Sequence, residues 1–182
     1  MSRVLIPLAP GCEELEAVTV IDILRRAGIS VTTAGLELGP VRASRGTVLL
    51  PDAELDAVLG ELFDMIVLPG GMPGSEYLKN DARVIVLLNR LAAAGKYVAA
   101  ICAAPMALHA AGLLQGKNAT SFPGVLDQLP GSHQYCNEGV VVDGNIVTSR
   151  GPGTAMDFAL TLVELLAGKA KRDQVEAGLE RC

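Results

Sequence analysis

The sequence predicts an α/β protein in which helices cover both faces of a doubly wound, mostly parallel sheet, and three observations lead to this prediction. Hydrophobic residues make up 50% of the chain while aromatic residues make up 3% and tryptophan is absent, so the core must be aliphatic. Aliphatic strands buried on both faces are typical of parallel sheets. Helix and strand signals alternate, which implies right-handed crossovers between parallel strands. The length of 182 residues fits a single domain over residues 1–182.

The first strand and helix have clear boundaries. Residues Arg3–Leu8 form an apolar run that predicts a buried strand. A helix is predicted over Glu13–Ala27, because acidic residues open it and Arg25 and Arg26 lie in its last turn, as the helix dipole favours. Gly28 then follows where a helix commonly ends, so charge and capping signal agree.

The later elements continue the alternation. A β-hairpin is predicted about the pair Asp143-Gly144, which separates two β-branched runs. The stretch 39–63 is mixed and contains short strand-like and helical pieces. The further predicted strands are Ser30–Ala34, Thr47–Leu50, Asp64–Leu68 and Tyr97–Ile101, and the further predicted helices are Leu55–Leu62, Ala82–Ala94 and the run "AMDFALTLVELLA" that Gly168 ends.

Charge and hydropathy exclude several classes of partner. The formal net charge of -5 gives no electrostatic reason to expect nucleic-acid binding, and the late basic run Lys169–Arg172 fits a solvated helix end. No apolar run approaches the roughly 20 residues needed to cross a bilayer. No charged-then-apolar leader opens the chain. We therefore expect a cytoplasmic protein that binds neither membrane nor nucleic acid.

The cysteines are expected to act as individual thiols. Cys12, Cys102, Cys136 and Cys182 contain no C-x-x-C pair, and with the two histidines they form no zinc spacing. A disulfide framework is not expected in a domain with this much core. We expect no metal and no other cofactor.

Candidate functional groups are expected where parallel strands end. Ligands and catalytic groups collect at the carboxyl ends of the strands in such sheets. Three predicted loops lie at these ends, at residues 9–13, 69–75 and 102–105.

Cys102 lies at an abrupt change from strand to helix in the stretch "KYVAAICAAPMAL". A strand that turns directly into a helix forces a strained backbone on the turn residue and needs small neighbours, here Ala100 and Ala104. The sulfur would then face the start of the following helix, whose dipole and free N–H groups favour a thiolate. Pro105 fits the first helical turn. The alternative is a small buried apolar residue, the usual role of a free cysteine.

The segment "PGGMPG" at 69–74 has three interpretations. It lacks the G-x-G-x-x-G spacing, and no Lys-Ser/Thr pair follows, which disfavours a phosphate-binding loop. A Gly-Gly pair after a strand also brings backbone N–H groups close to a reacting atom, so the amides of Gly71 and Ala103 could form an oxyanion hole beside Cys102. A tight turn without catalytic function fits the spacing equally well.

Glu16 lies on a largely apolar stripe of the first predicted helix, together with Val20, Ile23 and Ala27. A buried carboxyl has a raised pKa and could donate a hydrogen bond to a sulfur near neutral pH. An exposed Glu16 is the alternative. A cysteine hydrolase would also need a histidine base, but His109 is expected to point away from the elbow, and His133 could approach only through tertiary folding.

Four motifs together, "APGCEELEAV", "VLPGG", "AICAAP" and "TSRGPGTAMDFAL", resemble the DJ-1/ThiJ/PfpI superfamily, in the branch that contains the parkinsonism-associated protein and its bacterial relatives. The resemblance spans about residues 3–175 and implies a flavodoxin-like three-layer sandwich and a homodimer. It implies that Cys102 is the oxidation-sensitive nucleophile and that a protonated Glu16 donates a hydrogen bond to its sulfur. Gly71 and Ala103 would supply backbone amides.

The resemblance also implies a pocket rim and shows two departures. Ala103 stands where the peptidase branch has histidine, and Phe122 in "TSFP" stands where some relatives have a histidine near the pocket. Arg25, Arg26, Arg45 and residues 150–153 correspond to dimer-contact and rim segments. The implied rim residues are Gly70, Arg45, Phe122, Gly151 and Pro152.

The function implied by the resemblance is a cysteine-dependent, cofactor-free glyoxalase or deglycase that protects against carbonyl and oxidative stress. Cys102 would attack methylglyoxal or a glyoxal-derived adduct on protein, and Glu16 would move protons to give a hydroxy acid such as lactate. Scavenging of free aldehyde can mimic deglycase activity, so glyoxalase chemistry ranks first. The alternative is a non-enzymatic redox sensor or chaperone based on oxidation of Cys102. Both need a low pKa at Cys102. A cysteine peptidase or a thiamine-biosynthesis protein ranks lower.

Overall fold

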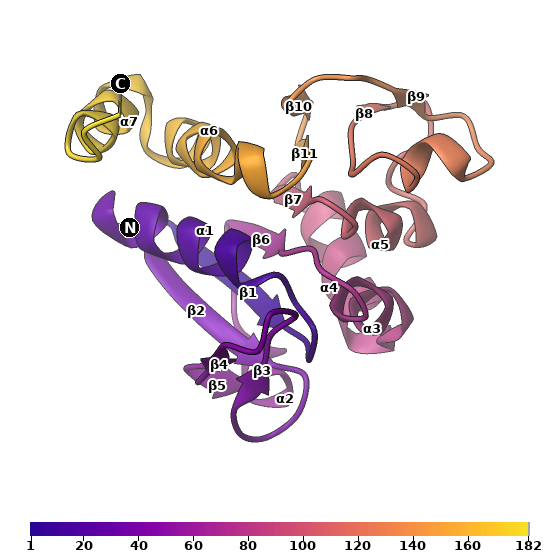
Figure 1. Ribbon diagram of the computed structural model, residues 1–182, viewed down its shortest axis with the longest axis horizontal. Coiled ribbons are helices and arrows are strands. Elements are labelled where there is room, and N and C mark those ends of the chain that lie inside the picture. Colours follow the sequence, from indigo (N-terminus) through magenta and orange to yellow (C-terminus); the bar gives the residue numbers. More distant parts are fainter. Residues whose placement is uncertain (182) are drawn as a thin grey trace.

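The computed structural model describes residues 1–181, and a seven-stranded sheet forms its centre (Figure 1). The strand order is β10-β11-β7-β6-β1-β2-β5. All neighbouring strands of this sheet are parallel except β10 and β11, which pair antiparallel. The predicted α/β sandwich with a mostly parallel sheet is therefore confirmed, and so is the hairpin about Asp143-Gly144.

The strands of the large sheet are β1 (Arg3–Leu8), β2 (Ser30–Gly35), β5 (Ala53–Glu54), β6 (Met65–Leu68), β7 (Tyr97–Ile101), β10 (Val140–Asp143) and β11 (Ile146–Ser149). Two small two-stranded sheets contain β3 (Val41–Arg42) with β4 (Val48–Leu49), and β8 (Asn118–Ala119) with β9 (Gln134–Tyr135). The helices are α1 (Glu14–Arg26), α2 (Leu55–Val58), α3 (Gly74–Asn80), α4 (Ala82–Ala93), α5 (Pro105–Ala110), α6 (Ala155–Ala167) and α7 (Lys169–Ala177), with 3-10 turns at Leu126–Gln128 and Pro152–Thr154.

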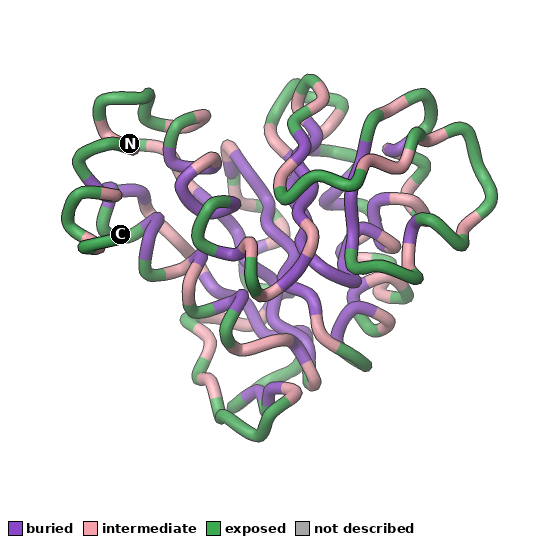
Figure 2. The backbone as a smooth tube through the Cα atoms, turned by 45° about the horizontal axis from the view of Figure 1, so that its top comes forward, coloured by how far each residue is buried: buried purple, intermediate pink, exposed green. Residues whose placement is uncertain are grey.

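Helices cover the two faces of the sheet and bury two aliphatic cores. Helices α1, α6 and α7 pack on one face, and α2, α3, α4 and α5 pack on the other (Figure 1). Alternate residues of β1 enter opposite cores: Val4 and Ile6 belong to the first, and Leu5 belongs to the second. Figure 2 shows the buried backbone through the centre and the exposed backbone in the peripheral loops. Because both faces are buried, the strands need the continuous apolar runs seen in the sequence.

The structure corrects several element boundaries. Helix α3 (Gly74–Asn80) directly follows the glycine-rich loop, which agrees with the alternative of a strand-to-helix turn, but the sequence predicts no bounds for this helix. The helix predicted over Leu55–Leu62 ends at Val58. The basic run Lys169–Arg172, expected at a solvated helix end, forms the first turn of helix α7 (Lys169–Ala177), a helix that was not among the predicted elements. No helix within residues 1–181 combines the length and the hydropathy that crossing a membrane requires.

The sheet order places three predicted loops together. Strands β7, β6 and β1 are neighbours and run parallel, so their carboxyl ends meet at one edge of the sheet. These ends lead into residues 102–105, 69–75 and 9–13, respectively. This edge is where parallel sheets hold their functional groups.

Candidate active site

Cys102 occupies a strained backbone position between β7 and α5. Its φ is 64°, and Glu180 is the one other non-glycine residue within 1–181 with a positive φ. Its N–H donates to the Ser149 carbonyl at 2.9 Å, and its carbonyl accepts from the Phe122 N–H at 2.8 Å. A left-handed conformation costs a non-glycine residue about 1–3 kcal/mol and persists only where the surroundings enforce it. The predicted strain at the bend is therefore confirmed.

Glu16 on α1 is fully buried beside Cys102. Its Oε2 accepts a hydrogen bond from the Gly70 N–H at 2.8 Å, and its Oε1 has no hydrogen-bond partner meeting ordinary geometry among the described residues. Burial raises the pKa of Glu16 from 4.5 to about 7, although the Gly70 amide and Cys102 lower it. The carboxyl group is thus partly protonated at neutral pH, and it can both donate and accept a proton.

Glycines bring the three loops into contact. A Cβ atom on Gly70 would lie 2.5 Å from Cys102 Cβ and 2.6 Å from Glu16 Oε2. A Cβ atom on Gly71, whose φ is +89°, would lie 2.4 Å from the Glu13 backbone nitrogen. Both distances are shorter than van der Waals contact allows, so the glycines permit the close approach of Cys102 to Glu16.

The electrostatics of Cys102 correct one prediction. Burial and the charge of an ionised Glu16 raise the pKa of the Cys102 thiol to about 12, while the N–H groups of Gly71 and Ala103 lower it. The expectation that the helix start alone would favour a thiolate is therefore wrong, since burial outweighs it. Once Glu16 holds its proton, its negative charge is gone and its O–H can donate to the sulfur. The thiolate is favoured when Glu16 is neutral.

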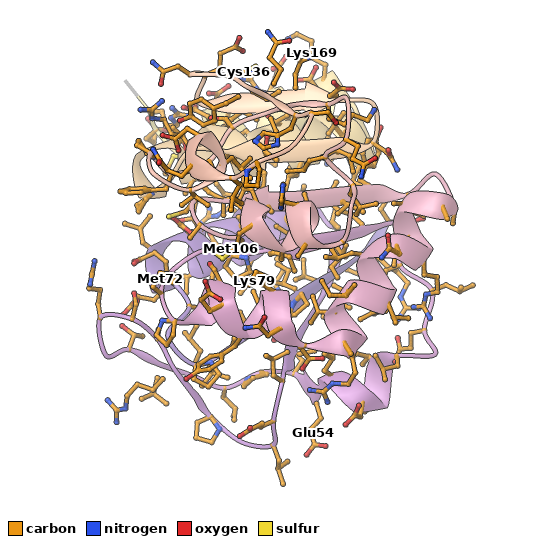
Figure 3. The ribbon with its side chains drawn as sticks, turned by 90° about the vertical axis from the view of Figure 1, so that its right-hand side faces the viewer. Glu54, Met72, Lys79, Met106, Cys136 and Lys169 are labelled. Atoms are coloured by element: carbon orange, nitrogen blue, oxygen red, sulfur yellow. The ribbon has the colours of Figure 1, made fainter. Side chains whose placement is uncertain are left out.

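A pocket of about 440 Å³ opens beside Cys102. Figure 3 labels Met72 and Met106, which line this pocket and lie near one another. Glu16 does not line it, so the buried carboxyl and the open volume contact different sides of the cysteine. We call this hollow the cysteine pocket; it is lined by Glu13, Ser44, Arg45, Gly71, Met72, Cys102, Ala103, Met106, Phe122, Gly124, Val125 and Pro152.

The predicted rim residues fall into two groups. Arg45, Phe122 and Pro152 line the cysteine pocket as predicted from the resemblance. Gly70 instead lies beneath it, buried against Cys102 and Glu16, and Gly151 lines a neighbouring hollow. Adjacent residues in a turn point in different directions. Which of them faces the pocket therefore depends on the folded backbone and cannot be predicted from the motif.

Sequence reasoning missed Glu13 and Ser44, which lie at the pocket wall. Glu13 was interpreted only as a charge at the start of a helix. In the structure, Ser44 Oγ lies 2.9 Å from Glu13 Oε2 and 3.1 Å from Glu14 Oε2. The acidic run "CEELE" indicates that carboxyl groups gather at this strand end. Their contacts with residues 44–47, however, are needed to distinguish Glu13 at the pocket wall from Glu14, which binds the loop.

Glu14 fastens the loop that carries Arg45. Its carboxylate accepts from the Arg45 and Thr47 amides at distances of 3.0 to 3.3 Å. Burial opposes ionisation of Glu14, but hydrogen bonds from backbone N–H groups and from Ser44 outweigh it and lower its pKa to about 2. Glu14 therefore stays ionised and holds the loop in place.

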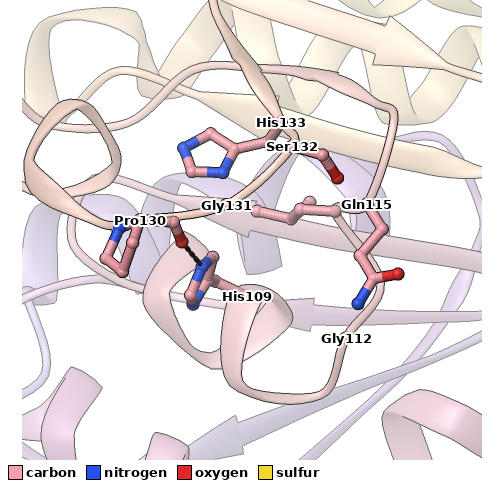
Figure 4. Close-up of a pocket in the computed structure, with 8 residues that line it drawn as sticks. His109, Gly112, Gln115, Pro130, Gly131, Ser132 and His133 are labelled. Atoms are coloured by element: carbon pink, nitrogen blue, oxygen red, sulfur yellow. Dashed lines mark hydrogen bonds between the residues drawn. The ribbon is translucent and has the colours of Figure 1, made fainter.

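The two histidines meet in a separate hollow of about 250 Å³ (Figure 4). Their ring centroids are 5.5 Å apart and the rings are nearly perpendicular, at 83°. His109 Nε2 donates to the Pro130 carbonyl at 2.8 Å, and His133 Nε2 donates to the Leu126 carbonyl at 2.9 Å. Neither ring lines the cysteine pocket, so the described residues assemble no cysteine–histidine pair there.

The remaining cysteines differ from Cys102. Cys12 is fully buried, and burial together with the nearby Glu14 raises its pKa to about 11. Cys136 is partly exposed, and Cys182 lies outside the described residues. Within residues 1–181, no group of three or more His, Cys, Asp and Glu side chains is arranged to hold a metal ion.

Comparison with known proteins assigns the chain to a family. The profile of the DJ-1/PfpI family matches residues 2–165. Protein dj-1beta of Drosophila melanogaster is 48% identical over 177 residues, which cover 96% of this chain and 95% of that protein. The glutathione-independent glyoxalase DJR-1.2 of Caenorhabditis elegans is 36% identical over 173 residues, covering 94% of this chain and 92% of that protein.

Solved structures agree with this assignment. The crystal structure of Drosophila melanogaster DJ-1beta superimposes with a TM-score of 0.96 at 46% identity and covers 100% of both chains. A structure of Toxoplasma gondii DJ-1, described as oxidized, gives a TM-score of 0.93 at 42% identity and covers 98% of both chains.

Proposed function

The chain belongs to the DJ-1/PfpI family, and we propose that it is a cysteine-dependent glyoxalase that converts small dicarbonyls such as methylglyoxal to hydroxy acids. The observation that carries this proposal is the pair formed by the strained Cys102 and the buried Glu16, whose pKa lies near 7. A nucleophile beside a group that exchanges protons at neutral pH is what this isomerisation needs. The naming of the Caenorhabditis elegans relative as a glyoxalase supports the reaction class.

The proposed reaction needs no external oxidant. The Cys102 thiolate attacks the aldehyde carbon and forms a hemithioacetal, whose oxygen takes up a proton. Glu16 removes the proton from that carbon and returns it to the adjacent carbonyl carbon, while the hydroxyl proton moves to the adjacent oxygen, which leaves a lactoyl thioester on Cys102. Water then cleaves the thioester to lactate and regenerates the thiol. One carbon is oxidised while its neighbour is reduced, so the electrons balance.

The backbone amides would stabilise charge during these steps. The N–H groups of Gly71 and Ala103 act on the sulfur of Cys102 in the free protein. We propose that they also donate to the oxyanion that forms on the adjacent carbon. Removal of one oxyanion-hole donor typically costs 10²–10³ in rate, so this contribution would be large.

A redox role for the same cysteine is the second candidate function. Toxoplasma gondii DJ-1 has been solved in an oxidized form, which favours this candidate. Hydrogen peroxide would oxidise the Cys102 thiolate to a sulfenate with release of water, and a second equivalent would give a sulfinate. A protonated Glu16 could donate a hydrogen bond to the sulfinate.

Repair of glycated proteins, a chaperone role, the homodimer, the cytoplasmic location and the single domain stay predictions from the sequence. The cysteine pocket has a volume of about 440 Å³, which admits a small dicarbonyl. Small free aldehydes are therefore the substrates that we propose first.

The test is conversion of methylglyoxal to lactate in a buffer without amines, thiols or glutathione. Lactate is quantified directly for the wild type and for Cys102→Ser. We expect many turnovers for the wild type and none above background for the variant, because serine lacks a comparably acidic nucleophile. Absence of lactate from folded wild-type protein would overturn the glyoxalase proposal and leave the redox role.

A further inference from the structure

The proposed reaction ends with a step for which Glu16 is poorly placed: it lies beside the sulfur and the carbon bonded to it, but not on the path of water that enters through the open pocket. The lactoyl group on Cys102 would occupy the cysteine pocket, since this is the open volume beside the sulfur. Glu16 is fully buried, does not line the pocket and accepts the Gly70 N–H. Water that attacks the thioester must enter through the pocket, so a base on the pocket wall is needed to take its proton.

From the pocket wall, we infer that Glu13 is the general base for hydrolysis of the acyl group on Cys102, an inference that rests on the proposed glyoxalase function. Arg45 is the other lining residue with a charged side chain, and a guanidinium cannot accept a proton. Phe122 occupies the wall position where some relatives have histidine. His109 and His133 line the other hollow and bond to backbone carbonyls there.

The position of Glu13 is fixed by contacts on two sides. Its backbone N–H donates to the Gly70 carbonyl at 2.8 Å, directly beneath the cysteine. Its Oε2 lies 2.9 Å from Ser44 Oγ, which shares its one hydroxyl proton between Glu13 and Glu14, and the Ser44 N–H donates to the Cys12 carbonyl at 2.8 Å. With Oε2 held by Ser44, Oε1 is the oxygen that can accept a proton from water.

Glu13 is also electrostatically coupled to the Cys102–Glu16 pair. Its negative charge contributes to the raised pKa of Glu16, after the larger effect of burial. One carboxyl group buried beside the nucleophile and another on the wall of its pocket suit a two-stage reaction. Glu16 would handle the proton transfers of the isomerisation, and Glu13 would handle the hydrolysis.

In the assigned step, Glu13 takes a proton from water as the oxygen attacks the thioester carbonyl carbon. The C–S bond of the resulting tetrahedral intermediate breaks, lactate is released, and the thiolate leaves. The proton on Glu13 passes to solvent through the open pocket or to the released sulfur. No oxidant or reductant is consumed.

The experiment compares wild type with Glu13→Gln, a substitution that keeps the size of the side chain and its acceptor for Ser44 Oγ. The proteins are mixed with methylglyoxal, and intact mass is followed together with lactate. We expect lactate release to fall about a hundredfold or more, while one lactoyl group accumulates on Cys102. Added hydroxylamine, a nucleophile that needs no base, should release the accumulated acyl group as its hydroxamate.

Glu14→Gln is the matched control, since Glu14 contacts the same loop through Ser44, Arg45 and Thr47 but does not line the pocket. We expect no lactoyl enzyme to accumulate in this variant. Accumulation in both variants would overturn the assignment and point to loop positioning. If the wild type produces lactate and Glu13→Gln hydrolyses the lactoyl group at the same rate, the role of Glu13 is overturned while the glyoxalase proposal stands. A wild type that forms neither lactate nor lactoyl enzyme would overturn the proposed glyoxalase itself.

Discussion

The two ends of helix α5 carry two different hollows built from residue types that often occur in active sites. At its start, Cys102, Ala103 and Met106 line the cysteine pocket. At its end, His109 lines the second hollow, where it meets His133. The ends lie only a few residues apart in sequence, yet their surroundings differ in strain, burial and hydrogen bonding.

Residue type alone therefore does not make a site reactive. Each imidazole donates its Nε2–H to a backbone carbonyl, although His133 Nδ1 is buried without a partner among the described residues, and neither histidine has a strained backbone. Cys102 instead has a positive φ, and a fully buried carboxyl group lies beside it. Energy stored in backbone strain and in an unfavourably buried acid is available for chemistry, whereas satisfied hydrogen bonds favour structure.

The largest effect that would test this comparison is expected from Glu16→Gln. Glutamine keeps the shape and the acceptor for the Gly70 N–H but cannot exchange a proton, so we expect turnover to fall about 10²- to 10⁴-fold with the fold intact. An ionised Glu16 raises the pKa of the Cys102 thiol and glutamine carries no charge, so alkylation of Cys102 by iodoacetamide should begin to rise at lower pH in the variant than in the wild type. Undiminished turnover would remove Glu16 from the mechanism.

The same variant gives a test of stability against pH. The pKa of Glu16 is raised in the folded state, so its favourable contribution is complete below pH 4.5 and is lost as pH rises through 7. The loss amounts to at most about 3 kcal/mol. Urea unfolding should therefore show Glu16→Gln gaining stability relative to wild type between pH 4.5 and 8. A constant difference across this range would contradict the raised pKa.

An intermediate effect is expected from Gly70→Ala. The added methyl group would overlap Cys102 and Glu16, and we expect a loss of about 1–3 kcal/mol in the free energy of unfolding together with lower turnover. Gly60→Ala is the matched control, because no atom lies within 4 Å of its added Cβ. It should change the stability by less than about 1 kcal/mol. Equal effects of the two substitutions would show that the close approach at Gly70 is unimportant.

The smallest effect is expected at the other end of α5. His109→Gln and His133→Gln each remove one hydrogen bond to a backbone carbonyl, at a cost of about 0.5–1.5 kcal/mol in stability. Turnover of methylglyoxal should stay at the wild-type rate. A drop in turnover of tenfold or more in a folded variant would show that the second hollow takes part in catalysis, and the contrast between the two ends would fail.

The aliphatic sheet, the bend at Cys102 and the candidate role of Glu16 could be predicted from the amino-acid sequence alone. These follow from local signals: buried strands need continuous apolar runs, a strand that turns directly into a helix needs small neighbours, and helical spacing places Glu16 on an apolar stripe. Family resemblance added three residues of the pocket wall, Arg45, Phe122 and Pro152. Each of these features depends on residues that are close in sequence or match a motif.

Which groups meet around the sulfur, and how their contacts change its pKa, depends on the tertiary structure and could not be predicted from local sequence. The hydrogen bond from Ser44 to Glu13, the place of Gly70 beneath the pocket, and the separation of the histidines from Cys102 all depend on contacts between distant segments. The pKa of Cys102 was predicted with the wrong sign for the same reason. The start of helix α5 can be predicted from local sequence. The burial and the Glu16 charge that raise the pKa of Cys102 arise only when three loops converge at one edge of the sheet.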